Sequence, residues 1–265
     1  MQVRVLQVAL NHNPMSNYII NTQNKQLTFL DGRFYWTEDG QFVPSVTTIL
    51  DAYPKDAGYY MWLKSVGQDA DTIRDEAGRR GTTVHEMTEA YDAGAEVSLL
   101  TEDGHLGYKV SEWAMFERYV EFIHRFKPEI MMTEHNFVNP ELGWAGTIDR
   151  VIKIGSPNPV TMLLDIKTSN AIYPTYWLQL AAYRRLLEEA GIYVDQVGIL
   201  WLNAKTRTNG KAGDIQGDGW QLLRKMACDT DEDLNLFVHT RALWMAQNHS
   251  AKPKQATYKL THQKF

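Results

Sequence analysis

The chain has 265 residues, of which 44% are hydrophobic and 22% are charged, and its formal net charge is −5. These proportions are typical of a soluble globular protein with a sizeable core, and the negative charge argues against indiscriminate coating of nucleic acid. The single cysteine, Cys228, excludes an internal disulfide framework and any cysteine-only metal or iron–sulfur site. No apolar run approaches the roughly 20 residues that span a bilayer, so we expect a cytoplasmic protein without a membrane partner.

The N-terminal region alternates apolar and polar residues, which indicates strands. Residues 1–10 predict one strand, and residues 18–43 predict a small antiparallel meander with turns at Asn-Lys and Asp-Gly pairs. A helix is expected after Pro44, with Ser45 as its N-cap and Pro54 beyond its end.

Helical periodicity continues over the next seventy residues. A second helix is predicted from about Tyr59 to Val66, and a third from Gly67 through Arg80. We expect Gly81 to interrupt this third helix, which resumes over residues 82–94 with Thr82 or Thr83 as a cap and carries His85. Another amphipathic helix is predicted over residues 111–126.

The period then changes to that of strands. Three strand-like runs cover residues 131–139, 143–155 and 160–169, and the short turns between them indicate an antiparallel meander. A helix over 176–190, a strand over 195–204, a polar hairpin or loop over 203–219 and a helix over 231–248 follow, with a basic tail after them.

This order predicts an α/β (α+β) fold with a central mixed β-sheet flanked by helices. We expect a single domain over residues 1–265, because no break in composition divides it. Its parts are the meander (1–43), a helical part with His85 (44–128), the sheet and its helix (129–205), and a hairpin with the C-terminal helix (206–265).

Two acidic residues on neighbouring predicted strands suggest a metal site. Asp165 and Lys167 share one face of their strand while Ile166 points to the core, and a short return can bring Asp149 level with Asp165. Paired carboxylates suit Mg²⁺ or Mn²⁺. The alternatives are an ordinary strand end and a salt bridge from Asp149 to Arg150 or Lys167.

Three further polar residues are candidates. His85 lies early in a helix, where a structural histidine is the alternative. The string His85-Glu86-Met87-Thr88-Glu89 departs from the zinc-protease pattern H-E-x-x-H at its last position. Gln179 and Tyr183 lie one helical turn apart and can hold a phosphate or a water, the alternative being the polar face of an amphipathic helix.

Four segments in this order resemble the successive motifs of a known superfamily: RRGTTVHEMTEAY, GTIDRVI, LLDIKTS and YWLQLAAYRRL. They are similar to the G-x-x-x-H, G-x-x-D, D-x-K and Q-x-x-x-Y motifs of the PD-(D/E)XK nucleases, in the RecB-like exonuclease branch. VPSVTTIL and the Trp-Leu-Lys helix after it also resemble phage exonucleases and the mitochondrial genome maintenance exonuclease. The resemblance covers about residues 42–205 and implies an α-β-β-β-α-β nuclease core.

The resemblance also implies roles for individual residues. The implied metal ligands are His85, Asp149, Asp165 and the carbonyl of Ile166. Lys167 is implied as the catalytic lysine beside the two aspartates, and Gln179 and Tyr183 as substrate-binding residues that steady the site. Glu134 is a weaker candidate. The implied cofactor is one or two Mg²⁺ or Mn²⁺ ions, and no iron–sulfur cluster.

The function expected from these features is metal-dependent DNA hydrolysis, most plainly by an exonuclease in recombination, repair or phage replication. The setting would be a bacterial or phage-infected cell. The partners would be DNA with single-stranded character and a separate helicase or recombination protein, since the chain has no phosphate-binding G-x-x-x-x-G-K-[ST] loop. The predicted DNA contacts are Arg79, Arg80, Lys64, Lys205 and Arg207 for phosphates, and Tyr59 and Trp62 for bases. The alternatives are a catalytically silent nucleic-acid-binding module and a metal hydrolase of a small phosphorylated molecule.

Overall fold

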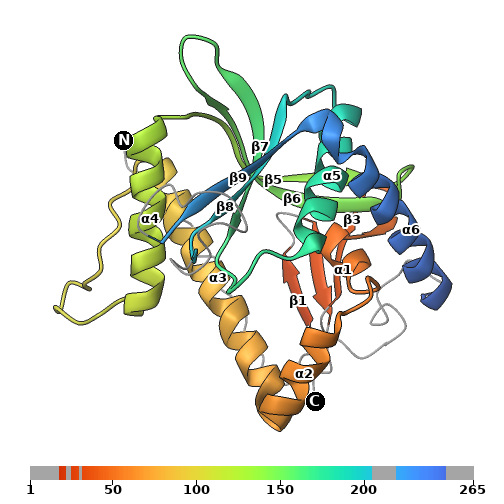
Figure 1. The fold of residues 1–265 in the computed structure, drawn as a ribbon, viewed down its shortest axis with the longest axis horizontal. Coiled ribbons are helices and arrows are strands. Elements are labelled where there is room, and N and C mark those ends of the chain that lie inside the picture. The colour runs from red at the N-terminus through yellow and green to blue at the C-terminus, as the bar shows by residue number, and fades with distance from the viewer. Residues whose placement is uncertain (1–17, 22–24, 30–31, 205–218, 249–265) are drawn as a thin grey trace, which may run out of the picture.

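A computed structural model describes residues 18–21, 25–29, 32–204 and 219–248, and Figure 1 shows a larger β-sheet with helices on both sides and a smaller sheet beside it. The smaller sheet is an antiparallel meander, as predicted for residues 18–43, with the strands β1 (Tyr18–Asn21), β2 (Gln26–Phe29), β3 (Gly32–Trp36) and β4 (Phe42–Pro44). The strand predicted over residues 1–10 lies outside the described residues.

The next helix begins where its cap was predicted. Ser45 Oγ accepts a hydrogen bond from the Thr48 amide at 3.0 Å at the start of α1 (Val46–Leu50). After it come α2 (Ala57–Val66), the 3-10 turn η1 (Gly67–Asp69), α3 (Ala70–Asp92) and α4 (Val110–Phe126). The expected helix positions are therefore confirmed, with boundaries that shift by up to three residues.

The predicted break at Gly81 is wrong, because α3 runs without interruption from Ala70 to Asp92. A single glycine costs a helix only about 1 kcal/mol, so packing easily overrides it. A side chain at position 81 would contact Thr168 Oγ1 at 3.5 Å, so the helix passes close to the end of a strand here. Thr82 does not cap a helix start, because its hydroxyl donates to the Gly78 carbonyl in mid-helix at 3.3 Å.

The larger sheet has five strands in the order β5-β6-β7-β8-β9. These strands are β5 (Glu129–Asn139), β6 (Trp144–Ile154), β7 (Val160–Lys167), β8 (Gln196–Trp201) and β9 (Gln221–Met226). Neighbours are antiparallel except β7 and β8, which are parallel because α5 (Pro174–Glu189) connects them as a crossover. The predicted mixed sheet and the order helix, three strands, helix and strand are confirmed.

The C-terminal part contains a strand that the sequence did not predict. β9 has the sequence QLLRKM, which lacks β-branched residues, and it pairs with β8 at the edge of the sheet. It leads through η3 (Ala227–Thr230) into α6 (Asp231–Gln247), the predicted last helix. Most of the hairpin predicted over 203–219 and the whole basic tail lie outside the described residues.

The sheet has one apolar core on each face. On one face, Val151, Leu163 and Ile199 pack with the side chains of α1, α5 and α6. On the other face, Ile152 and Leu164 pack with α3 and α4. Alternate strand positions therefore face different helices, as Figure 1 shows by the placement of α5 and α6 opposite α3 and α4. Among the described helices, none combines the length and the apolar character that crossing a bilayer requires.

Candidate active site

The predicted acidic residues meet where β6 and β7 separate. Backbone pairing between these strands ends at Arg150 and Leu164, so Asp149 and Asp165 occupy the next positions side by side, as the predicted register requires. Asp149 Oδ2 accepts a hydrogen bond from the Ile166 amide at 2.8 Å and takes the place of a ladder partner. Both aspartates are buried, Asp165 almost completely.

His85 reaches this fork from α3. Its Nε2 lies 3.1 Å from the carbonyl oxygen of Ile166, and its Nδ1 lies 3.4 Å from Glu134 Oε1 and 3.7 Å from Asp149 Oδ2. In the neutral tautomer with hydrogen on Nε2, the ring donates to the Ile166 carbonyl and turns a free Nδ1 lone pair toward the carboxylates. A backbone carbonyl commonly orients a metal-binding histidine in this way.

Glu134, the weaker candidate, lies in the centre of this cluster. It occupies the position on β5 between Thr133 and His135, whose partners on β6 are Arg150 and Ile148, so it stands across from Asp149. Potential ligand atoms of His85, Glu134 and Asp149 all lie within 4.8 Å of one another, close enough for one ion to contact all three. Oxygen ligands with one imidazole suit Mg²⁺ or Mn²⁺.

Asp165 belongs to a second group at the same fork. Its Oδ2 lies 2.7 Å from Lys167 Nζ, and its Oδ1 accepts a hydrogen bond from Gln179 Nε2 at 3.0 Å. Lys167 Nζ also donates to Gln179 Oε1 at 3.1 Å and lies 4.6 Å from the centre of the Tyr176 ring. Asp165 Oδ2 is therefore already paired with one cation, the ammonium group of Lys167.

The pKa values reflect this concentration of charge. Burial raises the pKa of Asp165 to about 6, although Lys167 opposes the shift. Burial lowers the pKa of His85, but the carboxylates of Asp149 and Glu134 outweigh it and bring the pKa to about 9. Burial also opposes the charge of Lys167, and Asp165 with Asp149 nevertheless raises the pKa of its ammonium. Without a metal, the negative charge of the carboxylates is therefore balanced by the proton on His85 and by the ammonium group of Lys167.

The other predicted residues take two kinds of position. Gln179 and Tyr183 are buried on α5. The amide of Gln179 already accepts a hydrogen bond from Lys167 and donates one to Asp165. Substrate contact by either residue therefore stays a prediction. Arg80 is half-buried, and its Nη2 donates to the Thr168 carbonyl, just after the end of β7, at 3.3 Å.

The remaining predicted DNA contacts are spread more widely. Arg79 and Lys64 are exposed, and the rings of Tyr59 and Trp62 lie 5.9 Å apart on α2. Lys205 and Arg207 lie outside the described residues.

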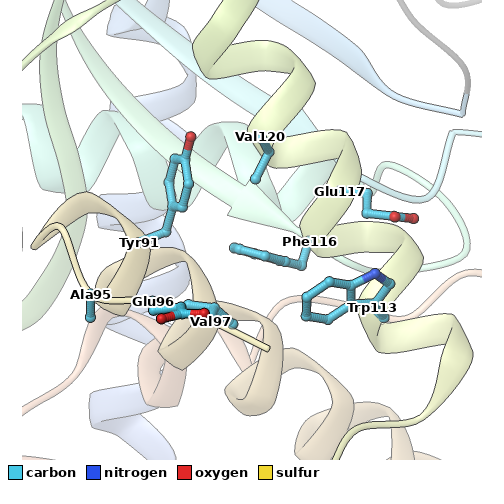
Figure 2. Close-up of a pocket in the computed structure, with 8 residues that line it drawn as sticks. All are labelled: Tyr91, Ala95, Glu96, Val97, Trp113, Phe116, Glu117 and Val120. Atoms are coloured by element: carbon cyan, nitrogen blue, oxygen red, sulfur yellow. The ribbon is translucent and has the colours of Figure 1, made fainter. Parts of the chain in front are cut away.

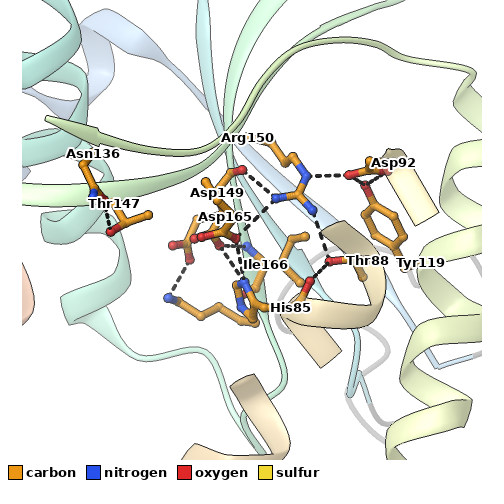
Figure 3. A network of polar contacts seen from close by, with 12 residues as sticks. His85, Thr88, Asp92, Tyr119, Asn136, Thr147, Asp149, Arg150, Asp165 and Ile166 are labelled. Carbon is orange, nitrogen blue, oxygen red and sulfur yellow. Dashed lines mark hydrogen bonds and ion pairs between the residues drawn. The ribbon is translucent and has the colours of Figure 1, made fainter. Parts of the chain in front are cut away.

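The sequence did not single out several residues that surround the site. Tyr176 lies beside the lysine, and Thr88, Asp92 and Arg150 form a polar network next to His85 (Figure 3). A signal existed for two of them. Thr88 and Asp92 follow His85 by three and seven residues and therefore share its helix face.

An apolar pocket of about 390 Å³ lies elsewhere, between the end of α3 and α4 (Figure 2). Its walls are mainly Tyr91, Val97, Trp113, Phe116 and Val120. It contains none of the candidate ligands and no lysine.

Known proteins add little to this description. No protein-family model matches the chain, and no curated protein matches it. Among solved structures, a protein from Eubacterium rectale named "Putative exonuclease" aligns with a TM-score of 0.38 at 15% identity, covering 71% of this chain and 77% of that one. A likeness at this level supports no argument about function, which therefore depends on the geometry of the site.

Proposed function

We propose that the protein is a metal-dependent DNA nuclease that acts as an exonuclease on ends with single-stranded character. The observation that carries this proposal is the convergence of His85, Glu134 and Asp149 within 4.8 Å, directly beside the buried pair of Asp165 and Lys167. The side chains of His85 and Glu134 are 27% and 25% exposed, so a substrate can reach the cluster from solvent.

The donor set fits a divalent cation of the Mg²⁺ or Mn²⁺ type. His85 Nδ1 and the carboxylates of Glu134 and Asp149 would hold it, and the neighbouring carboxylate of Asp165 could add a further oxygen. When bound, such an ion lowers the pKa of a coordinated water and offsets the charge that develops on a phosphodiester.

Lys167 supplies the second part of the chemistry. Asp165 favours its charged form, and Gln179 and Tyr176 fix the direction of its ammonium group. An ammonium held in this way can orient an attacking water or stabilise the negative charge of the phosphate in the transition state. The alternative of a silent binding module gives no reason to pair this lysine with a buried aspartate.

The polymer substrate and the action at ends follow from the resemblance to RecB-like exonucleases. One structural feature supports them. The helix α2 has no buried residue although it carries three neighbouring aromatic side chains, Tyr59, Tyr60 and Trp62. Tyr60 is exposed and the other two are half-buried, and partly exposed rings of this kind can stack on unpaired bases.

The test is hydrolysis of end-labelled single-stranded and double-stranded DNA with Mg²⁺ or Mn²⁺. The wild-type chain should degrade DNA and should lose this activity in a chelator, and Asp165→Ala should be inactive. Asp233→Ala is a matched control, because Asp233 forms its ion pair with Lys225 rather than with a site residue. Degradation by both the wild type and Asp165→Ala, or by neither, contradicts the proposal. A ladder of products shortened from one end distinguishes an exonuclease from an endonuclease.

A further inference from the structure

Arg150 is a fully buried arginine, and its position follows from the strand alternation. It follows Asp149 on β6, and its side chain is 0% exposed. Because Ile152 and Ile154 face the core under α3 and α4, Arg150 points to the same side. A charge in such a place is costly unless it is fully paired, so its contacts have to be accounted for.

The guanidinium group contacts two of the candidate metal ligands. Its Nη1 donates to the backbone carbonyl of Asp149 at 2.7 Å and to Glu134 Oε1 at 3.3 Å. The same Glu134 oxygen faces His85 Nδ1. Arg150 therefore holds the glutamate side chain on β5 and the main chain that carries the aspartate on β6.

The other side of the guanidinium is anchored on the helices. Its Nη2 donates to Thr88 Oγ1 at 3.2 Å, and the Thr88 hydroxyl donates to the carbonyl of His85 at 2.9 Å (Figure 3). Its Nε donates to Asp92 Oδ2 at 2.6 Å, and Asp92 also accepts hydrogen bonds from the Tyr119 hydroxyl on α4. One side chain thus connects α3, α4, β5 and β6 around the cluster.

Glu134 needs such support because its backbone is strained. Its φ of 43° lies in the left-handed region, which a residue with a side chain adopts rarely and at an energetic cost. The planar guanidinium fork supplies four hydrogen bonds in fixed directions. A lysine at position 150 would keep the charge but not this geometry.

We propose that Arg150 is a positioning residue, whose guanidinium holds the strained Glu134, the main chain of Asp149 and, through Thr88, the turn of His85 so that the three ligands converge on one divalent cation. This inference rests on the metal site of the proposed function. It assigns Arg150 no contact with the metal or the substrate.

The test is the affinity for Mn²⁺ in the absence of DNA, measured from the electron paramagnetic resonance signal of the free ion. The variant is Arg150→Lys, and the matched control is Arg184→Lys. Arg184 is also a largely buried arginine, but it pairs with Glu188 and Asp231, away from the cluster. Arg150→Lys should bind Mn²⁺ about 10- to 100-fold more weakly, as is typical when a residue that supports metal ligands is changed, whereas Arg184→Lys should stay within about twofold of the wild type.

Unchanged affinity in folded Arg150→Lys, or an equal loss in Arg184→Lys, overturns the proposal. If Arg150→Lys does not fold, Asp92→Asn decides, because it removes only the charge that anchors the guanidinium. Asp92→Asn should weaken Mn²⁺ binding by at least about threefold, and unchanged binding overturns the proposal. A wild-type chain that binds Mn²⁺ but degrades no DNA contradicts the nuclease proposal alone, whereas normal binding by Arg150→Lys contradicts the positioning proposal alone.

Discussion

Replacing Gly146 by alanine would place a methyl group where the ring of Tyr183 already lies. A Cβ atom built on Gly146 would be 2.3 Å from Cε1, 3.0 Å from Cζ and 3.1 Å from Cδ1 of that ring. Ordinary contact begins at 3.4 Å, so the ring or strand β6 would have to move by about 1.1 Å. The absence of a side chain at Gly146 therefore leaves the space that the ring of Tyr183 occupies.

The cost can be worked from this geometry. Tyr183 is 5% exposed and packs in the core between α5 and β6, so its ring cannot turn into solvent. Inserting a methyl group into a packed core costs about 1–3 kcal/mol, and the 2.3 Å contact predicts the upper half of that range. For a chain of this size, a loss of about 2–3 kcal/mol corresponds to a fall in Tm of about 4–12 °C.

Urea unfolding followed by circular dichroism measures the change. Gly78→Ala is the control, because Gly78 also lies in a regular element but has no atom within 4 Å of an added Cβ. That variant should gain about 0.5–1 kcal/mol from better helix propensity. In the Gly146→Ala background, Tyr183→Phe should give no relief, since the clashing atoms are ring carbons, whereas Tyr183→Leu should recover part of the loss. A Gly146→Ala chain within about 0.5 kcal/mol of the wild type would refute the reasoning.

Three further predictions concern the site. The pKa of His85 rises from 6.5 to about 9 on folding, so its proton stabilises the metal-free fold fully below pH 6.5, and this stability is lost as the pH rises toward 9. Mn²⁺ binding near neutral pH should accordingly release a proton, which calorimetry in buffers of different ionisation enthalpy detects, and His85→Gln should abolish the release. Arg150→Met should lose about 3–5 kcal/mol of unfolding free energy, because Asp92 stays buried without the arginine that pairs with it. A second change, Asp92→Leu, should restore most of this loss. A double variant whose loss is the sum of the two single losses would contradict this account. Lys167→Met should keep Mn²⁺ affinity but slow single-turnover DNA hydrolysis by about 100-fold or more, and an unchanged rate would exclude a catalytic role.

Much of the fold could be predicted from local patterns. The change from helical to strand periodicity near residue 130 located the sheet, and Ser45 located the start of α1 because a cap is a contact within one turn. The alternation of side chains along β7 placed Ile166 in the core and set Asp165 on the same face as Lys167, which the ion pair between them reflects. These are properties that a few neighbouring residues determine.

The strand β9 and the continuity of helix α3 were harder to predict, for a physical reason. β9 has weak strand propensity and forms because β8 offers it an unpaired edge. Gly81 has helix-breaking character, but α3 continues through it since the helix is packed on both sides of that point, by Ala70 at its start and by Val84 and Met87 beyond. In both cases tertiary contacts outweigh a local preference of about 1 kcal/mol.

The sequence by itself predicted which side chains could carry chemistry, namely His85, Asp149, Asp165 and Lys167, in an order that resembles the motifs of metal-dependent nucleases. Only the tertiary structure decided how these side chains separate into two groups of contacts. It set Glu134 with His85 and Asp149, and Asp165 with Lys167 and Gln179. It also buried Arg150 beside the first of these groups, where an arginine next to an aspartate in the sequence is otherwise an ordinary surface pair. Which side chains converge depends on the point where β6 and β7 part and on the distance at which α3 crosses the sheet, and both are fixed by packing between segments far apart in the chain.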